Sequence, residues 1–251
     1  GFPVDLAIRS NEPSTRLQGT KDLKTYNEDG EGNNGNLSWD SNLGWGKAYG
    51  STHLSYMFRR APSFMDVVAY SGTSAAHTIY HNLSVVPELI FLKGRQSGYK
   101  FRVEYVPSSI KFDLSSTAGA DTTNLFFTGI TNSYVYTPYG GSIGNFNGSK
   151  YVLYLFASLS GISKIGTYNG NTGSAVEVPC GFTNGARFVM IKRTNGTGDW
   201  YYWDTYRGIS ISNDKYRRFN EDAGDVTGTN YINPLITGFT VNASVPVSYT
   251  H

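Results

Sequence analysis

Short runs of β-branched and aromatic residues, separated by clusters of Gly, Asn and Ser, alternate along most of the chain. No stretch shows a sustained helical period of apolar residues, so the pattern is typical of an all-β protein. In the central part of the chain it predicts seven strands, at Val67–Tyr70, Thr78–His81, Leu89–Lys93, Phe101–Val106, Ile110–Leu114, Tyr134–Thr137 and Tyr151–Ala157. Both alternating sets of positions in the last strand are apolar, which predicts a central strand covered on both faces.

The chain also repeats itself with a period of about 98 residues. The segments that align at an offset of 98 or 99 are Gly50–Phe58 with Gly148–Phe156, Phe64–Gly72 with Ile162–Gly170, and Asn82–Lys93 with Gly181–Lys192. Gly1–Arg9 reads as the segment around Pro87 one repeat earlier, with Pro3 at the place of Pro87. Leu43–Trp45 aligns with Thr237–Phe239 at an offset of 194, about two periods.

A period near 100 residues is too long for a solenoid and suits tandem β-sandwich domains. We therefore expect an all-β chain of tandem β-sandwich units, jelly-roll or lectin-like, of about 98 residues each. Repeat 1 (residues 1–60) is the C-terminal part of a unit, repeat 2 (64–158) is complete, and repeat 3 (162–251) lacks its last strand. The aligned apolar positions should be buried in parallel, namely Ile90 with Val189, Leu92 with Ile191, and Leu153.

A sandwich that lacks a strand leaves backbone groups unpaired at the edge of its sheet, which favours pairing with another chain. We expect repeats 1 and 3 to make such contacts, or to continue into further sequence.

Charge and cysteine content exclude several classes of protein. The 21 basic and 19 acidic residues give a net charge of only +2, too balanced for a nucleic-acid-binding surface. No run approaches the roughly 18–20 apolar residues of a membrane span, so we expect no membrane insertion. The single cysteine, Cys180, excludes an intrachain disulfide framework and is best explained as an inert, small hydrophobic residue.

Paired carboxylates occur twice, 193 residues apart, in YNEDGE (Tyr26–Glu31) and in FNEDAG (Phe219–Gly224). Glu28/Asp29 and Glu221/Asp222 are candidates for acid–base catalysis or calcium binding. Repeat 2 carries LSST (Leu114–Thr117) at this place, so the repeat does not require the acids. Adjacent strand residues also point to opposite faces, whereas a glycosidase needs two carboxyls about 5–10 Å apart across a cleft. These residues are therefore better explained as turn formers.

No other motif predicts catalysis or metal binding. On a strand, His77 and His81 would lie about 13 Å apart, too far for one metal ion. The chain has no G-x-S-x-G motif, and its glycine-rich stretch NGNTG lacks the lysine and helix of a phosphate loop. We expect no catalytic residue, no metal and no cofactor, and hence no enzyme.

The segment WYYWD (Trp200–Asp204) is the best candidate for a binding surface, because it carries aromatic residues at both strand parities. At an offset of 100 it aligns with KFRVE in repeat 2, which predicts that Tyr201 and Trp203 face the core. The other parity would then present exposed aromatics to a partner chain, an adjacent unit or a glycan. The alternative is a buried strand or a packed domain junction. The predicted binding residues are Trp200 and Tyr202.

Several of these segments resemble a β-rich repeat domain of tail and tail-fibre proteins of tailed bacteriophages. They are FRRAPSFMDVVAYSG, NLSVVPELIFLKGR, GFTNGARFVMIKRTNGTGDWYYWDTYRG and GSKYVLYLFAS. The resemblance covers nearly the whole chain and is weakest at Asn11–Thr25. It implies a virion structural protein in a tail fibre or similar appendage, with a role in host attachment.

The same resemblance implies copies of the chain or other virion proteins as partners, together with a host-surface glycan. Two alternatives stay open. One is a carbohydrate-binding module or adhesin outside a virion. The other is a glycan depolymerase, for which the sequence offers no carboxylate pair in a groove.

Overall fold

The computed structural model of the chain describes residues 4–41, 44–47, 53–138, 143–243 and 245–246. This part of the chain is all-β, as the sequence predicts, and its only helical elements are the three-residue 3₁₀ turns Arg16–Gln18 and Val106–Ser108. No helix within the described ranges is long and apolar enough to cross a membrane.

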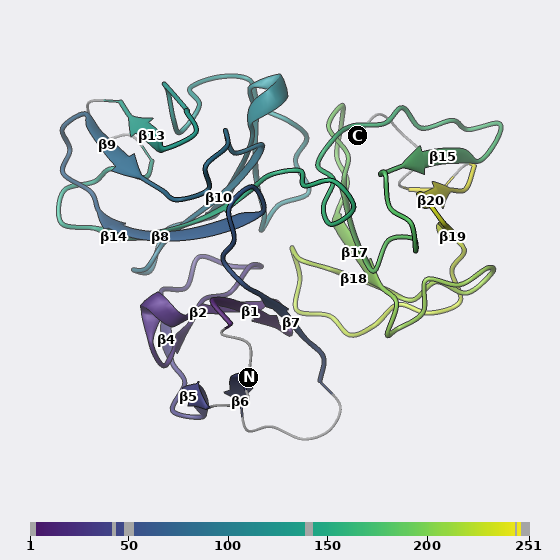
Figure 1. Cartoon of the computed structure of the whole chain (residues 1–251), viewed down its shortest axis with the longest axis horizontal. Coiled ribbons are helices and arrows are strands. Elements are labelled where there is room, and N and C mark those ends of the chain that lie inside the picture. Colours follow the sequence, from purple (N-terminus) through teal and green to yellow (C-terminus); the bar gives the residue numbers. More distant parts are fainter. Residues whose placement is uncertain (1–3, 42–43, 48–52, 139–142, 244, 247–251) are drawn as a thin grey trace. The chain divides into compact units, whose positions relative to one another are not determined.

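The chain forms two compact units (Figure 1). The first contains Gly1–Ser115 and Thr122–Ala157, and the second contains Ser116–Asp121 and Ser158–His251. The boundary after Ala157 lies close to the predicted boundary between repeats 2 and 3. The sequence did not predict that repeats 1 and 2 share one unit, or that Ser116–Asp121 belongs to the second.

Two five-stranded sheets dominate the first unit. The first sheet has the order β4 (Gly32–Asn33), β3 (Lys21–Asp22), β2 (Glu12–Thr15), β1 (Leu6–Arg9) and β7 (Ser55–Phe58). The second sheet has the order β12 (Ile110–Asp113), β11 (Phe101–Tyr105), β10 (Leu89–Gly94), β14 (Lys150–Phe156) and β8 (Met65–Ser71). Two strand pairs complete the unit: β13 (Tyr134–Thr137) with β9 (His77–Tyr80), and β5 (Leu37–Ser41) with β6 (Gly44–Lys47).

All seven strands predicted for repeat 2 are present as β8 to β14, with ends within two residues of the prediction. β9 and β13 form a second layer over the sheet of β8, β10 and β14 (Figure 1). The core between the layers includes Ile79, Ile90, Leu92, Val135, Leu153 and Leu155. The predicted burial of Ile90, Leu92 and Leu153 is confirmed, with exposed fractions of 1%, 2% and 0%. β14 is covered on both faces, since five of its seven residues in succession are buried.

The second unit also has two layers (Figure 1). One is the sheet of β16 (Phe188–Lys192), β17 (Trp200–Asp204) and β18 (Tyr216–Arg218). The other is the sheet of β15 (Val176–Pro179), β20 (Gly238–Val241) and β19 (Ile232–Leu235). The core includes Val189, Ile191, Trp203, Ile232 and Val241, so the predicted burial of Val189 and Ile191 is confirmed.

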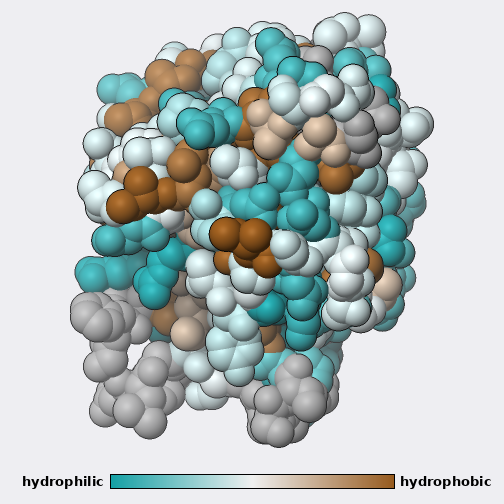
Figure 2. Space-filling model, turned by 90° about the vertical axis from the view of Figure 1, so that its right-hand side faces the viewer, coloured by the Kyte–Doolittle hydropathy of each residue, from teal (hydrophilic) through white to brown (hydrophobic). Residues whose placement is uncertain are grey.

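On the face of the molecule seen in Figure 2, hydrophobic residues lie in separate small groups among hydrophilic ones.

The three repeats build the same sheet from their hairpin outward. β1 and β2, β10 and β11, and β16 and β17 are antiparallel hairpins, and each second strand pairs with a third: β3, β12 and β18. In repeats 1 and 2 a later strand, β7 or β14, pairs with the free edge of the hairpin's first strand. In the part of repeat 3 that the structure describes, β16 pairs with β17 alone.

The register of the hairpins corrects one prediction. Lys93 pairs with Phe101, and Lys192 pairs with Trp200. The two hairpins are therefore related by an offset of 99, and the predicted offset of 100 over WYYWD is wrong. Because side chains alternate along a strand, this one-residue difference exchanges the two faces. Trp203 corresponds to Glu104, which shares a face with Ile90 and accepts hydrogen bonds from the backbone N–H groups of Phe126 and Phe127 at 3.0 and 3.3 Å.

One aligned pair of segments differs in structure. Phe64–Gly72 contains β8, whereas residues 162–170 contain no strand. Other aligned positions lie outside the described residues: Pro3, Leu43, residues 50–52 and residues 247–251.

Candidate functional site

The aromatic strand β17 is buried at every position. The exposed fractions of Trp200, Tyr201, Tyr202 and Trp203 are 2%, 8%, 1% and 0%. Tyr201 and Trp203 belong to the core of the second unit, as predicted. The expectation that Trp200 and Tyr202 are exposed is wrong.

Neighbours within the second unit account for the burial of Tyr202. Its ring stacks on Phe219 with the ring centroids 4.2 Å apart, and Phe188 lies 6.0 Å away. The guanidinium of Arg207 lies 5.8 Å from the centre of the Tyr202 ring. Burial raises the pKa of Tyr202 to about 12. Trp200 lies on the same face and has the ammonium of Lys192 5.7 Å from its ring centre.

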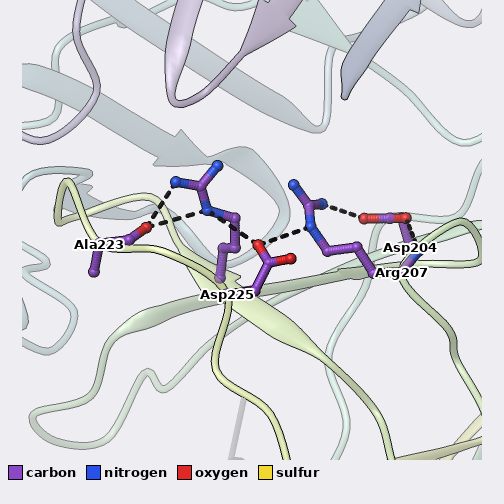
Figure 3. Close-up of polar contacts among 5 residues, drawn as sticks. Asp204, Arg207, Ala223 and Asp225 are labelled. Atoms are coloured by element: carbon purple, nitrogen blue, oxygen red, sulfur yellow. Dashed lines mark hydrogen bonds and ion pairs between the residues drawn. The ribbon is translucent and has the colours of Figure 1, made fainter. Parts of the chain in front are cut away.

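Arg207, which lies against the Tyr202 ring, belongs to an ion-pair network. Figure 3 shows Arg207 between Asp204 and Asp225. Arg207 forms an ion pair with Asp204 and donates a 3.1 Å hydrogen bond to Asp225. Arg217 donates to the carbonyl of Ala223 at 2.7 Å and lies 3.6 Å from Asp225. Two cations and two carboxylates balance, so this network stabilises the fold locally and leaves no net charge for an external ligand. Trp200 and Tyr202 thus offer no exposed aromatic surface, and their predicted binding role remains untested.

Two buried lysines form a pair of sites that sequence reasoning did not identify. Lys93, at 0% exposure, donates from Nζ to the carbonyls of Tyr99 (2.6 Å) and Asn27 (3.0 Å). Lys192, at 8% exposure, donates in the same way to the carbonyls of Gly198 (2.5 Å) and Thr117 (3.0 Å). Each lysine therefore joins the loop of its own hairpin to a distant segment of the chain. We call these two arrangements the lysine clamps.

The two clamps match in their electrostatics as well. Each ammonium lies near the ring of the residue opposite it in the hairpin, 5.9 Å from the centre of Phe101 and 5.7 Å from that of Trp200. Burial lowers the pKa of both Lys93 and Lys192 to about 8. Hydrogen bonds to backbone carbonyls offset part of the cost of burying the charge.

The clamped segments, arm 1 (Asn27–Glu31) and arm 2 (Ser116–Asp121), also pair with the hairpin loops through backbone atoms. In arm 1, the N–H of Glu31 donates to the carbonyl of Arg95 at 2.8 Å, and Gly98 donates back to Glu28 at 2.8 Å. In arm 2, Ala120 donates to Thr194 at 2.9 Å, and Gly198 donates back to Thr117 at 2.8 Å. Each arm therefore docks on its hairpin loop by both N–H and C=O groups.

A glycine in each arm approaches the hairpin loop closely. A Cβ atom at Gly30 would lie 2.7 Å from the backbone nitrogen of Ser97. At Gly119 it would lie 2.9 Å from the carbonyl oxygen of Gly196. Both contacts are too short for any side chain, so these positions require glycine because of the close backbone approach.

Two carboxylates of arm 1, those of Asp29 and Glu31, make structural contacts. The side-chain oxygen of Asn27 accepts the backbone N–H of Asp29 at 3.0 Å, which is the turn arrangement expected from the sequence. Asp29 also forms an ion pair with Lys24 at 3.1 Å. Glu31 receives two hydrogen bonds from Arg95, at 2.6 and 3.1 Å.

In the second carboxylate pair, Glu221 forms an ion pair with Arg218. Within the described ranges, no three His, Cys, Asp or Glu side chains gather as metal ligands would. The thiol of Cys180 is partly buried, and burial raises its pKa.

A cavity of about 380 Å³ lies in the first unit, at one end of the β10–β11 hairpin. Its lining includes Tyr99, Lys100, Arg102, Phe146 and Tyr151. The ring of Tyr99 meets the rings of Phe146 and Tyr151 nearly edge-on, with centroids 6.0 and 5.6 Å apart. Lys100 and Arg102 share one carboxylate, that of Asp113, so the cavity keeps one excess positive charge among these groups.

Comparison with known proteins gives one family. The family described as "Domain of unknown function (DUF7483)" matches residues 17–246. No curated protein and no solved structure matches the chain.

Proposed function

We propose that this chain, which belongs to the DUF7483 domain family, is a structural protein of a bacteriophage virion, part of a tail fibre or similar appendage that takes part in host attachment. The observation that carries the structural role is the pair of lysine clamps. Each clamp ties the segment that follows one repeat's hairpin sheet to the hairpin of the next repeat. This arrangement suits a tandem array and requires no catalytic group.

The chemistry of the clamps supports a structural rather than a ligand-binding role. Both lysines bind backbone carbonyls, and both arms pair through backbone N–H and C=O groups. The side chains of the arm are therefore free to differ, and they do: the first arm contains Asn-Glu-Asp before its glycine, where the second contains Ser-Thr-Ala. A linkage that does not depend on arm side chains can recur along a chain of related repeats.

The edge of β16 supports association with further protein. Within the described residues this strand has a partner on one side only, whereas β1 and β10 have partners on both. An open edge of this kind accepts an added strand from another polypeptide. Copies of the chain itself or other virion proteins are the proposed partners.

The virion location rests on the sequence resemblance to tail-fibre repeats, and purified particles test it. Peptide mass spectrometry of density-gradient-purified virions should detect this chain, and antibody labelling in electron microscopy should place it on an appendage. If the chain is absent from the particles of a phage that encodes it, the proposal fails.

A second function, glycan binding by the cavity of the first unit, is favoured by the cavity's composition. Aromatic rings line it, Phe146 is 39% exposed, and Lys100 and Arg102 add positive charge. This combination suits an acidic sugar, which would place its ring against an aromatic face and its carboxylate near the cations.

Nuclear magnetic resonance titration with glucuronic acid, with glucose for comparison, tests the glycan-binding proposal. Shifts should appear for wild type with the acidic sugar and be lost in Phe146→Ala. They should persist in the control Tyr80→Ala, which removes a 72% exposed ring outside the cavity lining. Equal shifts with both sugars, or none, would reject the acidic-sugar site.

A further inference from the structure

We propose that Phe219–Asp225, which we call arm 3, is a docking arm for the lysine-bearing hairpin loop of a repeat in another molecule. The inference rests on the proposed structural role, because it extends to a neighbouring molecule the linkage that the chain makes twice within itself.

Arm 3 has the sequence and the starting point of the two docked arms. FNEDAG (Phe219–Gly224) aligns without gaps with LSSTAG (Leu114–Gly119), and YNEDG (Tyr26–Gly30) differs from it by one residue. The three segments follow β18, β12 and β3, which are the third strands of their hairpin sheets. The anchoring bond is also the same. Leu114 N–H donates to the carbonyl of Phe101 at 2.8 Å, and Phe219 N–H donates to the corresponding carbonyl of Trp200 at 3.0 Å.

The glycine of arm 3 distinguishes it from the other two. Gly30 and Gly119 lie against the backbone of a hairpin loop, with no room for a Cβ atom. A Cβ at Gly224 would meet nothing within 4 Å. Asp222, Gly224 and Asp225 are also exposed. In the described part of the chain, arm 3 therefore has the features of a docked arm without the loop that the others bind.

The two clamps define the chemistry of the partner. It is a β-hairpin whose first strand ends in a buried lysine and whose loop offers a backbone carbonyl and a glycine N–H to the arm. Asp225 of arm 3 corresponds to Glu31 and Ala120, directly after the glycine, and pairs with Arg207 and Arg217 of its own unit. The contacts expected with the partner loop are therefore backbone hydrogen bonds, like those that arms 1 and 2 make. Within this chain Lys93 and Lys192 already hold arms 1 and 2, so the recipient is a hairpin not occupied by its own arm.

Such a recipient can be made from the chain itself. In Gly119→Val the new side chain collides with Gly196, so arm 2 leaves the Lys192 loop. Arm 3 of a second molecule should then occupy that loop and produce head-to-tail oligomers. The double variant Gly119→Val/Gly224→Val has the same vacated loop but an arm 3 that cannot approach it. Because Gly224 has free space around it, Gly224→Val alone should leave the fold unchanged.

Sedimentation velocity decides between the outcomes. We expect wild type and Gly224→Val to sediment alike, Gly119→Val to shift to larger species with concentration, and the double variant to lose that shift. Hydrogen exchange should show about tenfold slower exchange at the Asp225 amide in the Gly119→Val oligomers than in wild type. If circular dichroism shows that Gly119→Val is unfolded, Gly119→Ala, which adds only the Cβ, takes its place.

A folded Gly119 variant that stays monomeric, or that oligomerises equally with Gly224→Val, would overturn the proposal. These outcomes are independent of virion location: absence from purified particles would remove the proposed function and leave the self-association result unchanged.

Discussion

Repeats 2 and 3 each contain a β-hairpin with a lysine clamp, but they differ at the edge of the sheet. In repeat 2, β14 pairs with β10 along its whole length, from Leu89 with Phe156 to Gly94 with Tyr151. In repeat 3, β16 has β17 as its partner and no strand on the other side within the described residues. The clamp geometry is nevertheless the same, with two carbonyls on each lysine at 2.5 to 3.0 Å.

This difference shows that the hairpin, its lysine and the arm form a local unit that does not need the closing strand. The register of the hairpin and the position of the lysine at the end of its first strand are sufficient to build the clamp. The closing strand has another role, which is to pair the remaining edge of the hairpin's first strand.

The largest expected effect comes from a substitution in the closing strand β14, which should destabilise repeat 2 but not repeat 3. Leu153→Ala removes a fully buried side chain from β14 and should cost about 2–5 kcal/mol of stability in the first compact unit. Hydrogen exchange measured by mass spectrometry should show faster exchange in β8, β10 and β14 and no change in β16 to β18. Ile162→Ala, at a 63% exposed site, is the control and should change neither unit. Equal destabilisation of both units would mean that they unfold as one.

Removing each clamp lysine tests whether the two clamps are equivalent. Lys93→Met and Lys192→Met retain the approximate length of the side chain but remove the Nζ donor from two carbonyls, at a cost of about 1–3 kcal/mol per substitution. In Lys192→Met the carbonyl of Thr117 still accepts the N–H of Gly198. The rate at which the arm opens should differ between the two variants, because arm 1 keeps its Glu31–Arg95 ion pair when Lys93 is replaced. We therefore expect the Ala120 amide in Lys192→Met to exchange faster, relative to wild type, than the Glu31 amide in Lys93→Met. The reverse order would show that the ion pair does not hold arm 1.

A smaller effect is expected from pH. The pKa of about 8 for Lys93 and Lys192 lies below the value of about 10.4 in an unfolded chain. Between these pH values the unfolded state binds more protons, so the two lysines make the free energy of unfolding rise with pH. Urea denaturation at pH 8.0 and 9.5 should show this rise in wild type relative to the Lys93→Met/Lys192→Met double variant. Parallel pH dependence of the two proteins would show that the buried ammonium groups are not destabilised.

The smallest effect concerns the ion pair that only the first clamp has. Arg95→Ala removes the ion pair with Glu31, whose side chains are 18% and 15% exposed, and should cost about 0.2–1 kcal/mol. A double-mutant cycle with Glu31→Ala isolates the pair, and Arg193→Ala in the other loop is the matched control. A coupling energy near zero would show that the ion pair does not contribute to the docking of arm 1.

The sequence predicted the fold well where hydrophobic alternation was unambiguous. All seven strands of repeat 2 and the parallel burial of Ile90 with Val189 followed from it. It failed for Trp200 and Tyr202 because of the offset of 100. At the offset of 99 that the structure shows, these residues correspond to Phe101 and Val103, which are both buried. The side chains that cover Tyr202 could not be identified in this way, because Phe219 and Arg207 lie outside the strand.

The clamps were missed although their signal was present. Both aligned strands carry a lysine at or next to their last residue, in FLK and MIK, directly after a buried apolar residue. A charged residue at the same place in two apolar strands is a reason to look for a buried acceptor. The acceptors are backbone carbonyls on arms far away in sequence, so their identity could not be read from residue types.

Because Ser116–Asp121 belongs to the second compact unit, the connection between the two units has an unusual mechanical property. The polypeptide crosses between the units after Ser115, after Asp121 and after Ala157, so it forms three connections in place of one linker. A single protease cut near Ala157 would leave the units joined by the other two crossings. A pulling force applied across the units would also have to extract an arm held by Lys192 before the connections could extend. The protein would therefore carry tension through non-covalent tethers as well as through its backbone.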